Sequence, residues 1–163
     1  MRNNNPLNIR RGKTKWLGEV MGLKVRNNNG DVEIVTEEYD RVFCQFQTLE
    51  QGWRAAFLLL KKYINVYGCN TIEKIVKRWA PPSENATLTY INDVAFYSCI
   101  LSNIELEFTD TQKMLAIGSA MCMVENGTHY DPCRNNEWLS AMRGGYDIAL
   151  RNEQFRKDGA IRS

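Results

Sequence analysis

Two consecutive prolines, Pro81 and Pro82, constrain the possible folds of this chain more than any other feature. Proline lacks a backbone N–H and clashes with the preceding helical turn, so a helix that reaches Trp79 must stop there. The polar run 83–87 then provides caps for a new helix. The predicted apolar face of that helix comprises Leu88, Ile91, Val94 and Ala95. The side chains expected to cluster at the corner are Glu84, Asn85 and Tyr90. The pattern therefore predicts a sharp junction between two helices, which suits the wall of a cleft.

Length and composition favour a single domain over residues 1–163. With 44% hydrophobic residues, the chain can bury roughly two-thirds of its unfolded surface. It has no apolar run of the ~18 residues that a membrane span needs, and we expect no export signal in the chain as given. The net charge is only +2, but the first charged residues, Arg2, Arg10, Arg11, Lys13 and Lys15, are all basic. This weakly favours an anionic partner.

The cysteine and histidine content argues against a metal or cofactor. The five cysteines are odd in number and lack the spacing of zinc ligands, so we expect buried free thiols, with one or two disulfides as the alternative. His129 is the only histidine, which makes a Ser/His or Cys/His pair or a multi-histidine metal site improbable. We expect no cofactor.

The hydrophobic pattern divides the chain into three parts. Leu23, Val25, Val32 and Ile34 alternate with polar residues around Asn29-Gly30, a strong hairpin signal. Residues 42–46 read as a second extended piece. Helical periodicity follows, with helices expected to begin near Thr48, Thr71, Leu88, Thr109 and Asn136, and Gly144-Gly145 as a possible break in the last. The predicted fold is α+β, mainly α, with a hairpin lobe (1–47), a helical lobe (48–150) and a polar tail (151–163).

Several motifs resemble known cell-wall and phage families. The motif 3–11, followed by Trp16, Gly18, Phe43 and Phe46, resembles a phage-associated family, often labelled virion structural protein, whose signature reads Asn-Pro-Gly-Asn-Ile-Arg. Residues 52–55, 71–72 and 79–90 continue the pattern, although Leu7 stands where that family has Gly. The segment 78–94 is similar to the closing segment of lytic transglycosylases and lysozyme-like enzymes, and the first motif also resembles cell-wall glucosaminidases. The resemblance implies a lysozyme-like fold acting on peptidoglycan.

Glu125 is the candidate general acid. In the resembling families the catalytic Glu lies on a helix before the Asn-rich motif, and none precedes it here. The segment 121–132, an apolar helix that ends in Glu125, is similar to the site of that acid, which implies a circular permutation. The negative end of the helix dipole and the apolar neighbours Met121 and Val124 should raise the pKa of Glu125, which would suit proton donation to a glycosidic oxygen.

Two questions stay open at the level of sequence. Glu84 is the competing acid, although a Glu there more often caps the next helix. A second carboxylate, if the mechanism needs one, would come from Glu33, Glu37, Glu38 or Asp40. The sequence does not separate hydrolysis from the ring closure of lytic transglycosylases.

The remaining candidate residues are substrate contacts. Trp16, Trp79 and Tyr90 are candidates to stack on sugar faces, with core packing as the alternative for each, and Trp53 is expected to lie in the core. Asn5, Asn8 and Arg10 would bind N-acetyl groups or support the backbone, Glu84 and Asn85 would edge the cleft, and His129 would lie at the cleft mouth or on the surface. The expected partners are glycan strands and other virion proteins, in a phage virion or the bacterial envelope. The alternatives are a non-catalytic virion or wall-binding module and, less favoured, a nucleic-acid contact.

Overall fold

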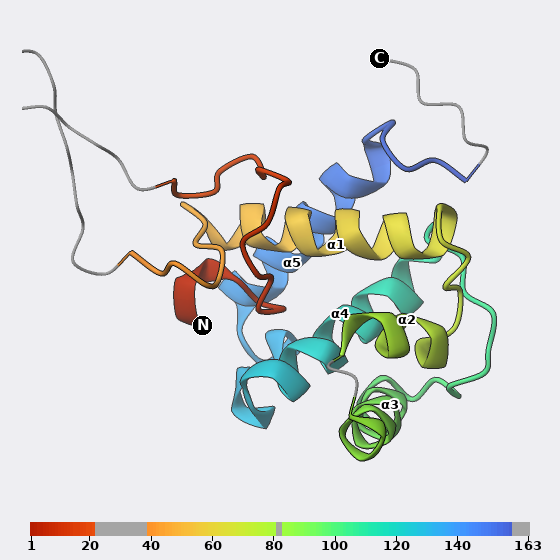
Figure 1. The fold of residues 1–163 in the computed structure, drawn as a ribbon. Helices are drawn as coiled ribbons and strands as arrows, with labels where there is room; N and C mark the ends of the chain where they lie inside the picture. Colours follow the sequence, from red (N-terminus) through yellow and green to blue (C-terminus); the bar gives the residue numbers. More distant parts are fainter. Residues whose placement is uncertain (22–38, 81–82, 158–163) are drawn as a thin grey trace, which may run out of the picture.

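The computed structural model describes residues 1–21, 39–80 and 83–157. Figure 1 shows a helical body, formed by the residues from α1 onward, and an N-terminal segment, residues 1–21 and 39–48, that folds against one end of it. The α-helices are α1 (Leu49–Asn65), α2 (Ile72–Trp79), α3 (Glu84–Ser98), α4 (Thr111–Asn126) and α5 (Asn136–Arg151). The short 3-10 helices are η1 (Arg2–Asn4), η2 (Thr128–Tyr130) and η3 (Pro132–Arg134).

Two helix pairs form the body. Helix α1 packs along α5, whereas α3 packs along α4 and also contacts α2. Trp53 and Phe57 of α1 stack with ring centroids 5.5 Å apart, and Tyr146 of α5 meets Phe57 edge-on at 5.2 Å. Gly145 permits the close approach of α1 and α5, because a Cβ there would lie 2.6 Å from the backbone nitrogen of Arg54. The predicted break at Gly144-Gly145 is therefore wrong, and α5 continues through it.

Most predicted helix boundaries are confirmed. Thr48 and Thr71 cap α1 and α2 by accepting hydrogen bonds from Gln51 N and Lys74 N. Helix α2 ends at Trp79, and only Ala80 separates it from the two prolines, as the sequence predicts. The cap of α4 is Asp110 rather than Thr109.

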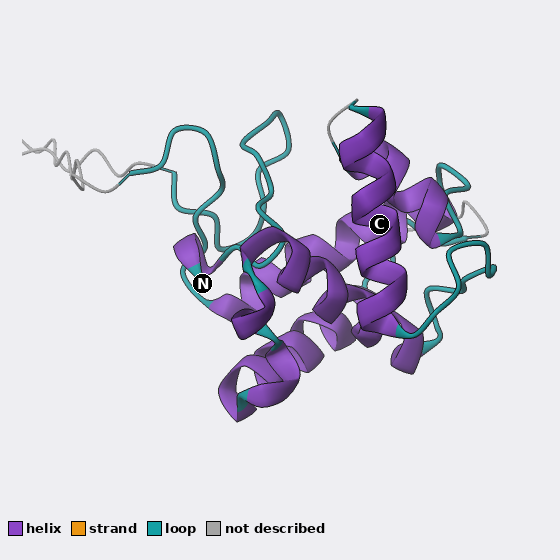
Figure 2. Cartoon of the chain, turned by 90° about the horizontal axis from the view of Figure 1, so that it is seen from below, coloured by secondary structure: helices purple, strands orange, loops and turns teal. Residues whose placement is uncertain are grey.

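The predicted α+β fold is wrong for the described residues, whose regular secondary structure is entirely helical (Figure 2). Only two isolated antiparallel bridges, Arg10 with Phe43 and Glu19 with Phe46, join the pieces expected to be extended. The predicted hairpin around Asn29-Gly30 lies outside the described residues. Asn3, Asn4 and Asn8 all have left-handed φ angles, so residues 3–8 do not provide a continuous strand that could pair with residues 42–46.

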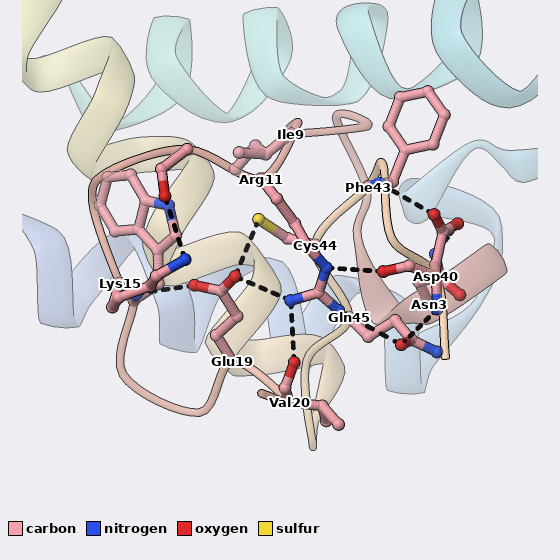
Figure 3. A network of polar contacts seen from close by, with 12 residues as sticks. Asn3, Ile9, Arg11, Lys15, Glu19, Val20, Asp40, Phe43, Cys44 and Gln45 are labelled. Atoms are coloured by element: carbon pink, nitrogen blue, oxygen red, sulfur yellow. Dashed lines mark hydrogen bonds and ion pairs between the residues drawn. The ribbon is translucent and has the colours of Figure 1, made fainter. Parts of the chain in front are cut away.

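Side chains, rather than a sheet, hold the N-terminal segment together (Figure 3). Arg11 forms a buried ion pair with Glu19 at 3.0 Å and donates to the Asp40 and Val20 carbonyls at 2.6 and 2.8 Å. Glu19 is fully buried at its side chain and also accepts from Trp16 N at 3.0 Å. The buried charges are thus satisfied by several partners each, which connects residues 9–20 to residues 40–45.

The described part of the tail is anchored rather than frayed. Asn65 donates to the Phe155 carbonyl at 2.8 Å, and Lys157 pairs with Glu107 at 2.7 Å. Buried Lys61 donates to the carbonyls of Ala149 and Asn152 at the end of α5. Residues 158–163 of the predicted tail lie outside the described residues.

Three surface predictions need correction or completion. Leu88, expected on the buried face of α3, is 56% exposed, whereas Ile91 and Val94 are buried. The five cysteines, all within the described part of the chain, are free thiols, of which only Cys44 and Cys122 are buried. Among the described residues, none of the helices combines the length and apolar character required to cross a membrane.

Candidate functional site

A cleft of about 600 Å³ lies where the N-terminal segment meets the helical body. The body contributes residues from α1, the end of α2, α3 and the last turn of α4. The lining residues are Asn8, Ile9, Arg10, Phe43, Leu59, Tyr63, Trp79, Ala80, Tyr90 and Glu125. Glu125 is the one acid among these described lining residues, and four of the ten are aromatic. The cleft therefore combines a single carboxyl group with flat apolar walls.

Helix α4 places Glu125 one residue before its C-terminal end. Gly127 terminates the helix with a φ of 109°, a conformation that favours glycine. The Tyr90 hydroxyl, from α3, donates to Oε2 of Glu125 at 3.3 Å. One carboxyl oxygen is thus engaged by a neighbouring helix.

The surroundings of Glu125 favour its protonated form. Burial raises the pKa of Glu125 above the ordinary value of 4.5, while hydrogen bonds from Asn8 and Tyr90 act in the opposite direction. Burial, followed by the charge of Glu125, also raises the pKa of Tyr90, so Tyr90 remains a hydrogen-bond donor. A buried carboxyl of this kind can hold a proton at a pH where an exposed one has lost it.

Reciprocal side-chain contacts attach the N-terminal segment to the end of α4. Asn8 Nδ2 donates to the Glu125 carbonyl at 3.3 Å, and Asn126 Nδ2 donates to the Pro6 carbonyl at 2.8 Å. Asn8 itself has a left-handed φ of 52°, whereas its neighbour Leu7, at the position where the resembling family has Gly, is fully buried. The expected adjacency of residues 3–11 and the Glu125 helix is present. The circular permutation stays a prediction.

The structure brings together five of the predicted site residues and separates others. Asn8, Arg10, Trp79, Tyr90 and Glu125 line one cleft. Two others, Asn5 and His129, are not among the residues that line it.

Asn5 is 1% exposed and lies beneath the segment instead of facing the cleft. Its Oδ1 accepts a hydrogen bond from Ile9 N, and its Nδ2 donates to the carbonyls of Ile9 and Cys44. His129 is exposed and packs on Tyr130 with ring centroids 4.3 Å apart. Glu84 and Asn85 begin α3, but their side chains lie outside the described structure.

Of the candidate second carboxylates, only Asp40 lies in the described residues, and it has a backbone role. It accepts from Val42 N and Phe43 N at 2.9 Å, and from Asn3 at 3.0 Å. The hydrogen bond from Phe43 N, followed by that from Val42 N, lowers its pKa to about 2. Asp40 therefore stabilises a turn as a carboxylate. Glu33, Glu37 and Glu38 lie outside the described residues.

The sequence prediction missed Leu59 and Tyr63 of α1, which form part of the cleft wall. They lie four residues apart, beside the buried stripe of the same helix. Tyr67, two residues beyond the end of α1, is 40% exposed. A pair of apolar residues at i and i+4 next to a core stripe was the available signal for a second apolar face.

A second hollow, of about 510 Å³, lies beside the end of α5 and is less suited to chemistry. Its buried cation, Lys61, is bound to backbone carbonyls that end the helix, where positive charge is stabilising. Its other charged residues include the pairs Lys157 with Glu107 and Arg156 with Glu153. This hollow thus carries structural contacts, and the Glu125 cleft is the candidate functional site.

Comparisons with known proteins connect the chain to a phage. No family model matches it. It is 36% identical over 145 residues to Protein P5 of Pseudoalteromonas phage PM2, in an alignment that spans 85% of this chain and 79% of that protein. This similarity establishes a phage relative, while the name of that protein says nothing of a reaction.

Proposed function

Because the chain belongs to the family of Protein P5 of Pseudoalteromonas phage PM2, we propose that it is a phage-associated enzyme that cleaves peptidoglycan glycan strands with Glu125 as general acid. The observation that carries the proposal is a carboxyl group of raised pKa, held by a tyrosine, in a cleft with aromatic walls. The lysozyme-like and lytic transglycosylase resemblance of the sequence supports the same chemistry.

The proposed chemical role follows from the protonation of Glu125. A glycosidic oxygen is a poor leaving group unless a proton is delivered to it as the bond to the anomeric carbon breaks. Burial favours the protonated form of Glu125, and the hydrogen bond from Tyr90 occupies Oε2, which leaves Oε1 to carry and deliver the proton. The anomeric carbon is then taken by a hydroxyl, either of water or of the sugar itself, and the proton of that hydroxyl passes to the Glu125 carboxylate and restores the acid. Between the two steps the Tyr90 hydroxyl stabilises the carboxylate.

The cleft walls suit a sugar chain. Trp79 and Tyr63 meet edge to face at 5.6 Å on one wall, so each holds the other in position. Phe43 on the opposite segment is covered by the Arg10 guanidinium at 5.2 Å from its ring centre. Such rings present flat apolar surfaces to the C–H faces of a sugar, and Arg10 adds hydrogen-bond donors for its oxygens.

The decisive experiment compares Glu125→Gln with the parent protein on purified cell walls, using loss of turbidity. Glutamine keeps the shape of the side chain but has no transferable proton, so activity should fall roughly 10²- to 10⁴-fold. Glu105→Gln, which removes an exposed carboxylate before α4, is the matched control and should retain activity. A folded Glu125→Gln protein with full lytic activity would refute the assignment.

The role of Tyr90 is tested by Tyr90→Phe. Since the Tyr90 hydrogen bond lowers the pKa of Glu125, its loss should raise that pKa and move the alkaline limb of the pH–rate profile to higher pH. A role in sugar stacking alone would change KM and leave the profile in place. If the parent protein binds cell walls and cleaves none, the non-catalytic binding module is the correct function.

A further inference from the structure

Two cations converge on one exposed aromatic ring beside the cleft. The Arg78 guanidinium lies 3.7 Å from the centre of the Tyr67 ring, and Lys62 Nζ lies 5.4 Å from the same centre. Tyr67 is 40% exposed, and Arg78 is exposed as well. The two positive charges repel each other, so another group must stabilise their approach. The face of the Tyr67 ring is one such group.

The pair is connected to the cleft through a shared side chain. Tyr63 lines the cleft, meets Trp79 there, and lies with its ring centre 6.0 Å from that of Tyr67. Arg78 also covers Tyr63, at 5.6 Å from its ring centre. The two cations therefore lie one aromatic ring away from the cleft.

The charges of Lys62 and Arg78 have no ion-pair partner among the carboxylates of residues 1–21, 39–80 and 83–157 whose side chains are described. The acid nearest in sequence on α2, Glu73, pairs with Lys77 at 2.7 Å instead. The pKa of Tyr67 is lowered, mainly by a hydrogen bond from Lys62 and then by the charges of both cations, which indicates a positive local potential.

We propose that Lys62 and Arg78 form an anion-binding subsite next to the cleft, which takes carboxylate groups attached to the glycan strand. This assignment of the ligand rests on the proposed function. Both cations lie in the last turns of their helices, where the helix dipole alone would favour positive charge. Lys62 also lies 5.4 Å from the centre of the Phe155 ring, and the dipole does not explain why both cations face the exposed Tyr67 ring beside the cleft.

The test measures binding with Glu125→Gln protein, so that no strand is cleaved. The ligands are strands with peptide stems, strands with the stems removed by an amidase, which keep the lactyl carboxylate, and neutral N-acetylglucosamine oligomers. Lys62→Gln and Arg78→Gln should each weaken binding of the carboxylate-bearing strands about two- to fivefold at low salt, as expected for an exposed ion pair, and less at high salt. Binding of the neutral oligomers should not change.

Two further variants make the result specific. Lys77→Gln removes a charge from α2 that is already paired and should bind like its parent. Arg78→Lys keeps the charge and should retain most of the affinity, and thermal unfolding verifies that each variant is folded. A preference for stem-bearing over stem-free strands that Lys62→Gln or Arg78→Gln abolishes would identify the stem carboxylates as the ligand.

The outcomes separate this proposal from the proposed function. If Glu125→Gln abolishes lysis while the double variant Lys62→Gln/Arg78→Gln binds all three ligands normally, the subsite is wrong and the enzyme stands. If the parent lyses no cell wall but charge-dependent strand binding is found, the subsite stands and the enzyme assignment fails. Tighter, variant-sensitive binding of single-stranded DNA would overturn the glycan as the ligand.

Discussion

The helical body and the N-terminal segment are stabilised in different ways. The body buries apolar stripes, such as Trp53, Phe57 and Tyr146, which lie at helical spacing in the sequence. The segment has isolated bridges in place of a ladder, and it relies on polar side chains that bond to distant main-chain atoms, as Arg11 and Asn5 do. The segment also contributes Leu7, Ile9 and Phe46 to the apolar core, but its own parts are joined to one another by a few polar side chains.

This difference matters because the cleft lies between the two regions. Glu125, Tyr90 and Trp79 come from the body, whereas Asn8 and Arg10 come from the segment. A change that loosens the segment should alter the cleft without unfolding the helices, whereas a change in the body should affect both. The predictions below test this contrast.

The largest effect is expected from Trp53→Ala in the body. Trp53 is fully buried and stacks on Phe57, so its truncation should cost about 3 to 5 kcal/mol of unfolding free energy. Chemical denaturation measures the loss, and native-state hydrogen exchange should increase in every helix and in the segment. Phe96→Ala, at a ring that is 76% exposed, is the matched control and should change stability by no more than about 0.5 kcal/mol.

Arg11→Met should produce a smaller and local effect. It leaves the buried Glu19 carboxylate unpaired, which costs about 3 kcal/mol, at the lower end for a broken buried pair because the segment can open to water. Hydrogen exchange should rise in residues 9–20 and 40–46 and stay unchanged in α1 and α5. Arg11→Met/Glu19→Gln should recover part of the loss, since no charge is then buried alone. An equal rise in α1 would contradict the independence of the two regions.

The same contrast explains how much the sequence could predict. Helices α1 and α2 follow from periodicity and from the threonine caps, which are local signals. The segment does not, because a buried Arg11–Glu19 pair or an Asn5 side chain bonded to Cys44 depends on contacts between distant residues. Residues 42–46 were interpreted as an extended strand, but in the described structure they make only isolated bridges. The alternating residues 23–34 lie outside the described residues.

The candidate site was predictable to a similar extent. Glu125 and Trp79 were recognisable because each ends a helix at a marked boundary, and the resemblance pointed to Asn8 and Arg10. Tyr63 was not, because its lining role depends on how α1 and α2 pack. For Asn5 the sequence left both roles open, since an asparagine in such a motif is equally suited to bind a ligand or its own main chain, and the structure shows the second role.

Asn8→Ala tests the attachment of the segment to α4. The variant loses the bond to the Glu125 carbonyl, worth about 1 kcal/mol, and places alanine at a left-handed φ, at a cost of roughly another 1 kcal/mol. Asn8→Gly relieves the second cost and loses only the bond, so denaturation should show about half the effect. Equal losses in the two variants would show that the left-handed conformation adds no strain.

The smallest effect is a pH-dependent gain in stability in Glu125→Gln. Glutamine resembles the protonated carboxyl, and the raised pKa means that the folded protein holds the Glu125 proton more tightly than the unfolded chain. The stabilisation by protonated Glu125 is complete below its ordinary value of 4.5 and is lost as the pH rises through the folded pKa. The melting temperatures of the parent and of Glu125→Gln should therefore agree in acid, and the variant should become the more stable as pH increases.

Thermal unfolding across pH measures this difference, with Glu105→Gln as the control for loss of a surface carboxylate. The N-terminal segment should also affect this stability difference, because Asn8 is among the groups that lower the pKa of Glu125. In an Asn8→Gly background the gain from Glu125→Gln should therefore become larger and level off at a higher pH. A difference that is independent of pH would show that Glu125 ionises as in an unfolded chain, and the argument for a general acid at the junction of the two regions would then fail.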